Sequence, residues 1–139
     1  MRVLFDSNVI IDAISSRPQS NEASKQLFLL ASSRDIEGYL VSKQITDIHY
    51  CLRKYVSSED KRCEFISFLL EAFQIIPLEK ADLQKALTLR MKDYEDAVLV
   101  AASSRSSIDF IVTNDQKDFS SSRVKILTPQ EALGKFQEK

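Results

Sequence analysis

The stretch MRVLFDSNVII, residues 1–11, decides how the fold is interpreted. Its apolar run from Met1 to Phe5 is typical of a short buried strand, and it stops abruptly at Asp6. Apolar residues resume at helical spacing from Val9, so the stretch predicts a strand, a polar turn and a helix. In open α/β sheets such a turn lies at the carboxyl end of a strand, where ligand crevices form. We therefore interpret Asp6 as a ligand of a divalent metal ion, joined by acidic segments from later in the chain.

Composition narrows the chemistry by what it lacks. The chain has 139 residues, 44% of them hydrophobic and 28% charged, which predicts a single globular domain over residues 1–139. With only two glycines it has no Gly-rich phosphate loop, and with one histidine it has no paired-histidine catalysis or multi-histidine zinc site. The net charge of −1 creates no global positive field for nucleic acid or membrane, so a nucleic-acid partner needs a local basic patch or a bridging metal.

Cysteine usage and hydropathy predict a cytoplasmic setting. Cys51 and Cys63 show no metal-ligand spacing, which favours a reduced compartment. No apolar run approaches about 18 residues, so no membrane span is expected. Because the chain enters its first strand at residue 2, no secretory signal is expected either.

Hydrophobic periodicity predicts strands that alternate with helices. The predicted strands are residues 1–5, 36–41, 74–78, 109–112 and 124–127. The predicted helices begin at residues 9, 21, 43, 59, 79, 93 and 129, and the fifth of them runs to Lys92. Three of these helices have a predicted apolar stripe. The stripe of the third helix is Ile45, Ile48, Leu52 and Val56, that of the fourth is Ile66, Leu69, Leu70 and Phe73, and that of the fifth is Leu83, Ala86, Leu87 and Met91. Pro77 places its strand near a sheet edge. This alternation of strands and helices predicts a mostly parallel sheet of four to five strands with helices on both faces.

Four aspartates are predicted to meet at one edge of this sheet. Asp6 and Asp115 follow two strand ends, and parallel right-handed connections place such ends together. Ser42 ends the second strand and leads into the helix that carries Asp47, while Asp96 lies in the first turn of an Ala-rich helix. Carboxylates gathered in this way repel one another, and a divalent cation is their natural counter-charge. Mg²⁺ or Mn²⁺ suits an all-oxygen site, and it can activate water and neutralise charge on a phosphodiester.

Each of these residues also has a structural interpretation. Asp6 fits an N-cap, and Asp93 is expected to cap its helix, with Asp96 able to support the cap while facing the crevice. Asp47 lies off the apolar stripe of its helix, as a solvated surface carboxylate would. The segment 115–118 is rich in turn residues, among which Asp is common.

Two further groups are interpreted in structural terms. His49 falls near an apolar stripe and is expected to be a packed or hydrogen-bonded structural residue. The basic side chains of Arg53, Lys54, Lys61 and Arg62 form either a solvated face or a basic lip for RNA.

Taken together, the motifs resemble the PIN-domain family of metal-dependent nucleases. The family has an Asp-Thr/Ser-Asn turn after its first strand, here Asp6-Ser7-Asn8, and a Glu early in the helix after a serine-ended strand, here replaced by Asp47 in residues 42–47. It also has an acidic residue opening a buried Ala-rich helix, here Glu95-Asp96-Ala97. A strand ending in Thr-Asn-Asp follows, here residues 111–115, with Asp118-Phe119 downstream.

The resemblance implies a three-layer α/β/α sandwich and Mg²⁺- or Mn²⁺-dependent cleavage of single-stranded RNA. Asp6, Asp96 and Asp115 would hold the metal, with Asp47 as a further catalytic carboxylate. The residues expected to assist, orient carboxylates or contact substrate are Ser7, Asn8, Asp93, Thr113, Asn114 and Asp118. Small family members are often toxins (VapC-like) that form homodimers and are silenced by a small antitoxin.

Two other interpretations remain open. The Asp at position 47, one methylene shorter than the family's Glu, favours a PIN-like module that binds RNA or protein with weak or no catalysis. A phosphotransfer protein is the third possibility, but Asn8 stands where such proteins need a second aspartate.

Overall fold

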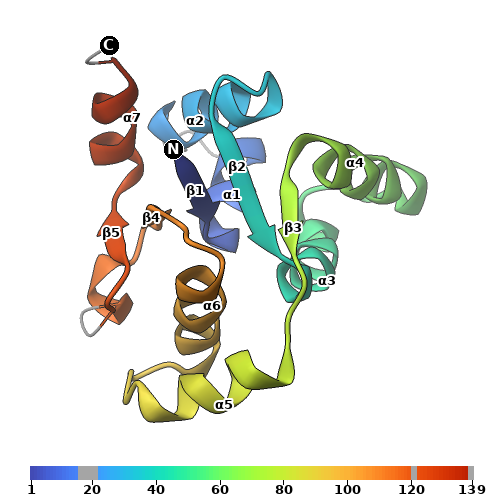
Figure 1. Ribbon diagram of the computed structural model, residues 1–139. Helices are drawn as coiled ribbons and strands as arrows, with labels where there is room; N and C mark the ends of the chain where they lie inside the picture. Colours follow the sequence, from blue (N-terminus) through green and yellow to red (C-terminus); the bar gives the residue numbers. More distant parts are fainter. Residues whose placement is uncertain (16–21, 120–121, 138–139) are drawn as a thin grey trace.

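The N-terminal strand β1 (Arg2–Phe5) is the central strand of a parallel five-stranded sheet (Figure 1). The computed structural model describes residues 1–15, 22–119 and 122–137. The strand order is β3-β2-β1-β4-β5, with β2 at Glu37–Val41, β3 at Gln74–Ile76, β4 at Phe110–Val112 and β5 at Lys125–Leu127. Phe5 pairs in register with Val112, so the carboxyl ends of β1 and β4 coincide. The parallel sheet agrees with the sequence prediction, and β3 lies at the edge that Pro77 indicated.

Side chains of β1 alternate between two hydrophobic layers. Val3 and Phe5 pack in one core cluster, and Leu4 packs in a second cluster on the opposite face. The first face is covered by α1 (Ser7–Ile14), α2 (Glu22–Ser32), α3 (Ser42–Cys51), α4 (Glu59–Ala72) and α7 (Pro129–Gln137). The second face is covered by α6 (Tyr94–Arg105), and α5 (Lys80–Thr88) packs against α6. This arrangement confirms the three-layer α/β/α prediction.

Three helix starts follow the signals that the sequence carries. Ser58 accepts a hydrogen bond from the backbone N of Lys61 (3.3 Å) at the start of α4. At α7 the bonds are reciprocal: Glu131 N donates to Thr128 Oγ1 (3.2 Å), and Thr128 N donates to Glu131 Oε1 (3.0 Å). Asp93 caps α6, as predicted. Each such cap is worth about 1 kcal/mol, enough to fix where a short helix begins.

Two helices are shorter than predicted. The helix α5 ends at Thr88 rather than Lys92, because Arg90 adopts a left-handed backbone (φ 53°) that no glycine or proline announces. The helix α3 ends at Cys51, a single 3₁₀ turn, η1 (Leu52–Lys54), follows, and Val56 packs on the core from outside any helix. The predicted start of the second helix, residue 21, lies outside the described residues.

The predicted apolar stripes of α4 and α5 are also partly wrong. Leu70 is 50% exposed and Leu87 is 71% exposed. In α5 the predicted Ala86 is buried as expected, and it is joined there by Asp82, whose carboxylate accepts two hydrogen bonds of 2.8 Å from Arg105. A buried carboxylate on the inner face shifts the helix phase that hydrophobicity alone predicts. Within the described residues, the helices are too short or too polar to cross a bilayer.

Candidate active site

Asp6 lies where the sequence places it, immediately after the carboxyl end of β1. Its backbone N donates to Val112 O (2.9 Å), which continues the β1–β4 ladder by one bond. Asp6 occupies the N-cap position of α1 with extended backbone angles (φ −66°, ψ 147°), but its side chain forms no regular cap bond. Asp6 is 9% exposed, so its carboxylate is largely withdrawn from water, and the Thr113 hydroxyl with the backbone groups of Ser7 and Asn8 offsets only part of that cost, because the pKa of Asp6 is still raised.

A chain of hydrogen bonds joins the first and fourth acidic segments. Thr113 Oγ1 donates a hydrogen bond to Asp6 Oδ2 (2.7 Å), and Thr113 Oγ1 also accepts one from Asp115 N (3.0 Å). Asn8 Nδ2 donates to Asp115 Oδ2 (3.0 Å), and Asn8 Oδ1 accepts from Asn114 N (3.4 Å). Residues more than 100 positions apart in sequence are thereby held together, as the parallel topology predicts.

The third acidic segment reaches the same place through α6. Asp93 Oδ1 accepts from the backbone N of Glu95 (2.8 Å) and of Asp96 (3.3 Å), so Asp93 acts as the helix cap that the sequence predicted. Asp96 then faces a polar cavity of about 350 Å³ at the carboxyl edge of the sheet. The cavity is lined by Asp6, Ser7, Lys43, Gln44, Asp47, Tyr50, Cys51, Glu95, Asp96 and Leu99.

Negative charge in this region is not balanced. Partial burial raises the pKa of Asp96 to about 7, and the charges of Asp6, Asp93, Asp118 and Asp115 contribute to the shift. Burial also raises the pKa of Asp6, although the Thr113 hydrogen bond opposes the shift. Among the described residues, no lysine or arginine pairs with Asp6, Asp96, Asp115 or Asp118. Within the part of the chain that the structure describes, these carboxylates do not form a group of three with ligand atoms within 4.8 Å of one another, so the excess negative charge is the feature here that favours a divalent cation with oxygen ligands.

Asp47, the predicted second carboxylate, has a different environment. Lys43 Nζ lies 2.6 Å from Asp47 Oδ2 and 3.5 Å from Glu95 Oε1. Burial tends to lower the pKa of Lys43, but the hydrogen bond and charge of Asp47, together with Glu95, outweigh it and raise the pKa. Asp47 therefore lines the cavity as an ion-paired carboxylate, whereas Asp6 and Asp96 are unpaired.

Asp115 and Asp118 do not line this cavity. They line a separate hollow of about 410 Å³, with Asn114, Gln116 and Lys117. Asp118 lies on the 3₁₀ turn η2 (Gln116–Phe119), which Phe119 anchors in the core at 2% exposure. Both carboxylates act electrostatically on Asp96, so the two hollows share one charged group of side chains.

Sequence reasoning missed Gln44, which is 2% exposed. Its Oε1 accepts from Val41 N (2.7 Å), and its Nε2 donates to Phe5 O (2.8 Å) and to Ser7 Oγ (3.1 Å). One amide thus joins the ends of β1 and β2 beneath the cavity. Its position three residues after Val41, the N-cap of α3, is a signal for a capping side chain that was available in the sequence. Lys43 was also missed, because an i, i+4 ion pair on a helix is common on ordinary surfaces.

The basic residues do not act as one group. Arg62 is engaged by Glu59 and by Val56 O, whereas the guanidinium of Arg53 lies 5.0 Å from the ring centroid of Tyr50. Tyr50 is 66% exposed and lines the cavity. His49 is hydrogen-bonded to Glu59 (3.2 Å), in agreement with the hydrogen-bonded histidine that the sequence predicted.

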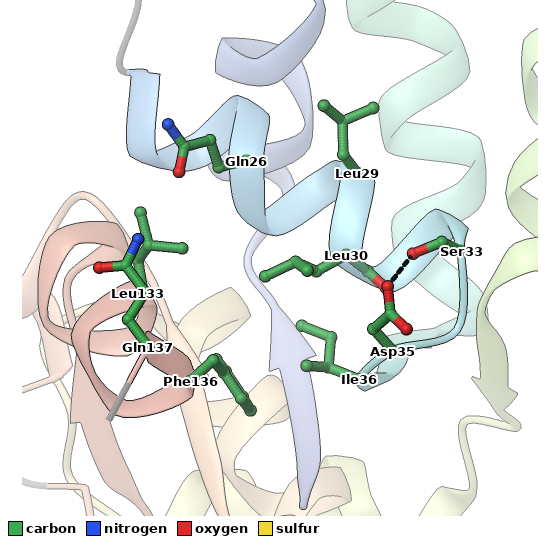
Figure 2. A pocket seen from close by; sticks show the side chains of 9 residues that line it. All are labelled: Gln26, Leu29, Leu30, Ser33, Asp35, Ile36, Leu133, Phe136 and Gln137. Atoms are coloured by element: carbon green, nitrogen blue, oxygen red, sulfur yellow. Dashed lines mark hydrogen bonds between the residues drawn. The ribbon is translucent and has the colours of Figure 1, made fainter. Parts of the chain in front are cut away.

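A larger cavity lies away from these carboxylates, between α2 and α7, and has a volume of about 620 Å³ (Figure 2). Its walls are mainly apolar, including Leu30, Ile36 and Phe136. Its carboxylate, Asp35, accepts a hydrogen bond from Ser33 (2.6 Å). A single carboxylate in an apolar groove cannot collect a metal ion, so the smaller polar cavity is the candidate active site.

The comparison with known families identifies the family of this chain. The family model described as "PIN domain" matches residues 2–117, which is most of the chain and includes Asp6, Asp47, Asp96 and Asp115 but not Asp118. The chain therefore belongs to the PIN-domain family of nucleases. No significant match to this chain exists among curated proteins.

Solved structures show the same fold at low sequence identity. FitAcB from Neisseria gonorrhoeae is 20% identical with a TM-score of 0.70, covering 92% of this chain and 98% of that chain. A toxin–antitoxin complex from Klebsiella pneumoniae is 22% identical with a TM-score of 0.69, covering 91% and 97%. VapC20 from Mycobacterium tuberculosis, a sarcin–ricin loop cleaving toxin, is 8% identical with a TM-score of 0.62, covering 78% and 86%.

Proposed function

We propose that this protein is a Mg²⁺- or Mn²⁺-dependent endoribonuclease that cleaves phosphodiester bonds of single-stranded RNA. The observation that carries the proposal is the unpaired, partly buried group of carboxylates around Asp96, whose pKa is raised to about 7. A group of this kind is unstable as a purely structural feature, because each carboxylate raises the cost of ionising the others. Bound metal would supply the positive charge that activates water and stabilises charge developing on the phosphoryl group.

The contacts of each residue suggest the role that it would have in this reaction. Asp6, Asp96 and Asp115 would hold the metal, and Thr113, as donor to Asp6, would keep one carboxylate oxygen turned away from the ion. Asn8 would orient Asp115 in the same way. Asp118 would add negative charge near Asp96. Asp47 would hold the Lys43 ammonium group by their ion pair, and this ammonium group would contact a substrate phosphate.

The opening of the cavity offers a surface for an unpaired base. Tyr50 is exposed there, and the Arg53 guanidinium lies over its ring, 5.0 Å from the ring centroid. The bases of single strands can stack on aromatic rings and guanidinium groups, whereas the bases of a duplex are paired and are not exposed for such stacking. This supports single-stranded RNA as the substrate and gives the predicted basic lip one residue, Arg53.

The biological setting is proposed by similarity. Several structures with this fold are toxin–antitoxin complexes, some of them bound to DNA. We propose that this chain is a cytoplasmic toxin of such a pair, acting as a homodimer and silenced by a small antitoxin.

A second function is favoured by one observation, the ion pair between Asp47 and Lys43. If this carboxylate is committed to Lys43, the protein could bind RNA or a partner protein without turnover. The two functions differ in whether the remaining carboxylates take up metal.

The test combines RNA cleavage with thermal melting. Purified protein should cleave single-stranded RNA with Mg²⁺ or Mn²⁺, and a chelator, Asp6→Asn or Asp96→Asn should abolish cleavage. Mn²⁺ at 100 times its Kd should stabilise the wild-type protein by about 2.7 kcal/mol, and both variants should lose that shift. Asp60→Asn is the matched control, because Asp60 is an exposed residue of α4 outside the cavity. This variant should retain both RNA cleavage and the Mn²⁺-dependent stabilisation.

The outcomes separate the two functions. Absence of both RNA cleavage and a Mn²⁺-dependent shift would favour the binding module. Cleavage that persists in both cavity variants would contradict the proposed site.

A further inference from the structure

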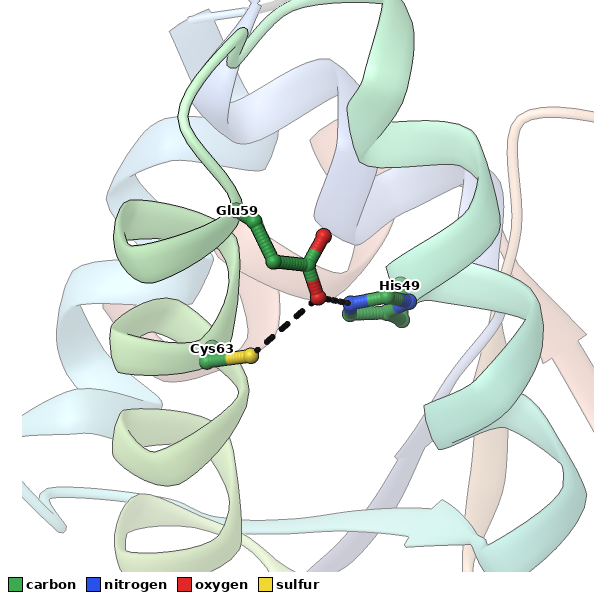
Figure 3. A group of neighbouring side chains, drawn as sticks. All are labelled: His49, Glu59 and Cys63. Atoms are coloured by element: carbon green, nitrogen blue, oxygen red, sulfur yellow. Dashed lines mark hydrogen bonds and ion pairs between the residues drawn. The ribbon is translucent and has the colours of Figure 1, made fainter.

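A second cluster of potential metal ligands lies between α3 and α4, outside the group of carboxylates (Figure 3). It consists of His49 on α3, and of Glu59 and Cys63 on α4. Glu59 and Cys63 are four residues apart, so they share one face of the helix, and His49 points toward them from the neighbouring helix. One ligand atom of each residue lies within 4.8 Å of the other two.

The Glu59 carboxylate is held in position before any ligand arrives. Its Oε2 accepts from Arg62 Nη2 (2.6 Å) and Nε (3.1 Å), and Arg62 itself donates to Val56 O (2.6 Å). The other oxygen, Oε1, is directed at His49 Nε2 (3.2 Å) and Cys63 Sγ (3.5 Å). An outer partner that fixes a ligand's orientation in this way is a regular feature of protein metal sites.

Two of the three ligand separations match those around a small tetrahedral ion. Zinc bonds of about 2.0–2.3 Å place adjacent N and O ligands roughly 3.3 Å apart, and O and S ligands roughly 3.6 Å apart. The corresponding separations here, both of them hydrogen bonds to Glu59, are 3.2 Å and 3.5 Å. The third separation, between a ring nitrogen of His49 and Cys63 Sγ, is within 4.8 Å, so an ion that replaces the two hydrogen bonds would also draw these two side chains together.

We propose that His49, Glu59 and Cys63 form a Zn²⁺-binding site with one open position. The imidazole and thiolate ligands select zinc or a similar transition metal over Mg²⁺, which prefers oxygen alone. Glu59 and an ionised Cys63 supply two negative charges against the one positive charge of Arg62, so a divalent cation is accommodated. The bound ion would cross-link α3 to α4, and α3 also carries Lys43 and Asp47 of the cavity.

The test uses Co²⁺ as a spectroscopic substitute for Zn²⁺, with protein reduced by a phosphine that does not bind the metal. Co²⁺ should produce a thiolate charge-transfer band in the near ultraviolet and visible bands of tetrahedral cobalt, saturating at one ion per chain. One equivalent of Zn²⁺ should remove these bands. Cys63→Ser should remove the charge-transfer band, and His49→Gln should weaken Co²⁺ binding by more than about tenfold, the lower bound for changes at metal-site partners.

Matched controls separate this site from its surroundings. Cys51→Ser changes the other free, exposed cysteine and should leave the spectrum unchanged. Asp96→Asn should also leave the thiolate band in place, because it belongs to the carboxylate group. Folding of each variant is checked by circular dichroism without metal. Absence of the band in folded wild-type protein, or its loss in Cys51→Ser but not in Cys63→Ser, would overturn the proposal.

Discussion

Thr113 is the residue through which the two ends of the candidate site are held together. Its hydroxyl accepts from Asp115 N (3.0 Å), and the hydroxyl proton is then left to donate to Asp6 Oδ2 (2.7 Å). Thr113 is itself fully buried, so neither bond can be replaced by bulk water. Its role is to position Asp6.

Replacing this hydroxyl should weaken metal binding. Thr113→Val keeps the shape of the side chain but leaves Asp115 N and the Asp6 carboxylate without their partner, which should cost about 1–3 kcal/mol of stability. The apparent Mn²⁺ affinity, measured by titration calorimetry, should fall about 10–100-fold. Thr113→Ser, which restores the hydroxyl, should recover most of the affinity. Equal affinity in the Val and wild-type proteins would show that Thr113 does not orient Asp6.

At the scale of an element, α3 serves three surfaces at once. Ile48 is buried against the sheet, Asp47 lines the cavity, and His49 reaches α4. Successive residues of a helix point about 100° apart, so three consecutive positions can serve three different neighbours. A shift in the position of α3 would therefore alter the cavity and the His49 cluster together.

The two glycines give a test of how tightly the elements pack. A Cβ at Gly38 on β2 would lie 2.7 Å from the Phe73 ring and 3.0 Å from the Ala31 Cβ, whereas a Cβ at Gly134 would meet nothing within 4 Å. Gly38→Ala should therefore cost about 1–3 kcal/mol of unfolding free energy through overpacking. Gly134→Ala in α7 should instead stabilise the protein by about 0.5–1 kcal/mol, because alanine has the higher helix propensity.

Denaturant unfolding of both variants measures these opposite signs. Phe73 is 3% exposed and packs edge-on against Phe5 with ring centroids 5.3 Å apart, so its ring has little room to move. A neutral Gly38→Ala variant would show that the Phe73 ring can yield.

At the scale of the whole molecule, topology concentrates charge and so makes stability depend on pH. The pKa of Asp96 rises from 3.8 in the unfolded chain to about 7 in the folded protein, so the folded state binds more protons between these values. Stability of the metal-free protein should therefore fall as pH rises from about 4 to about 7. The raised pKa of Asp6 acts in the same direction.

Thermal melting over pH 5–8 tests this linkage. Metal-free Asp96→Asn should melt at a higher temperature than wild type at pH 8 and should show a weaker pH dependence. Saturating Mn²⁺ should reduce the dependence in wild type, because the cation competes with the proton. Asp60→Asn should keep the wild-type profile, and an unchanged profile in Asp96→Asn would contradict the linkage.

Local sequence signals were reliable where one residue decides the outcome. The carboxylates after β1 and β4 and the caps Ser58, Asp93 and Thr128 follow the predicted pattern, because turns and caps depend on chemistry within a few residues. Helix ends were less reliable where no such residue exists. Thr88 ends α5 because the backbone at Arg90 turns left-handed, and that turn leaves no mark in hydrophobicity.

By itself, the sequence determined the α/β/α class, the family and the four acidic segments, because parallel strand ends must share one edge of a sheet. Which carboxylates lack a basic partner was decided only by the tertiary structure. The same is true of the ion pair between Lys43 and Asp47 and of the hydrogen bonds by which Gln44 joins two strand ends beneath the cavity. Only the tertiary structure also brought His49, Glu59 and Cys63 together. Such contacts depend on distances between side chains of different elements, and no local pattern of residues encodes those distances.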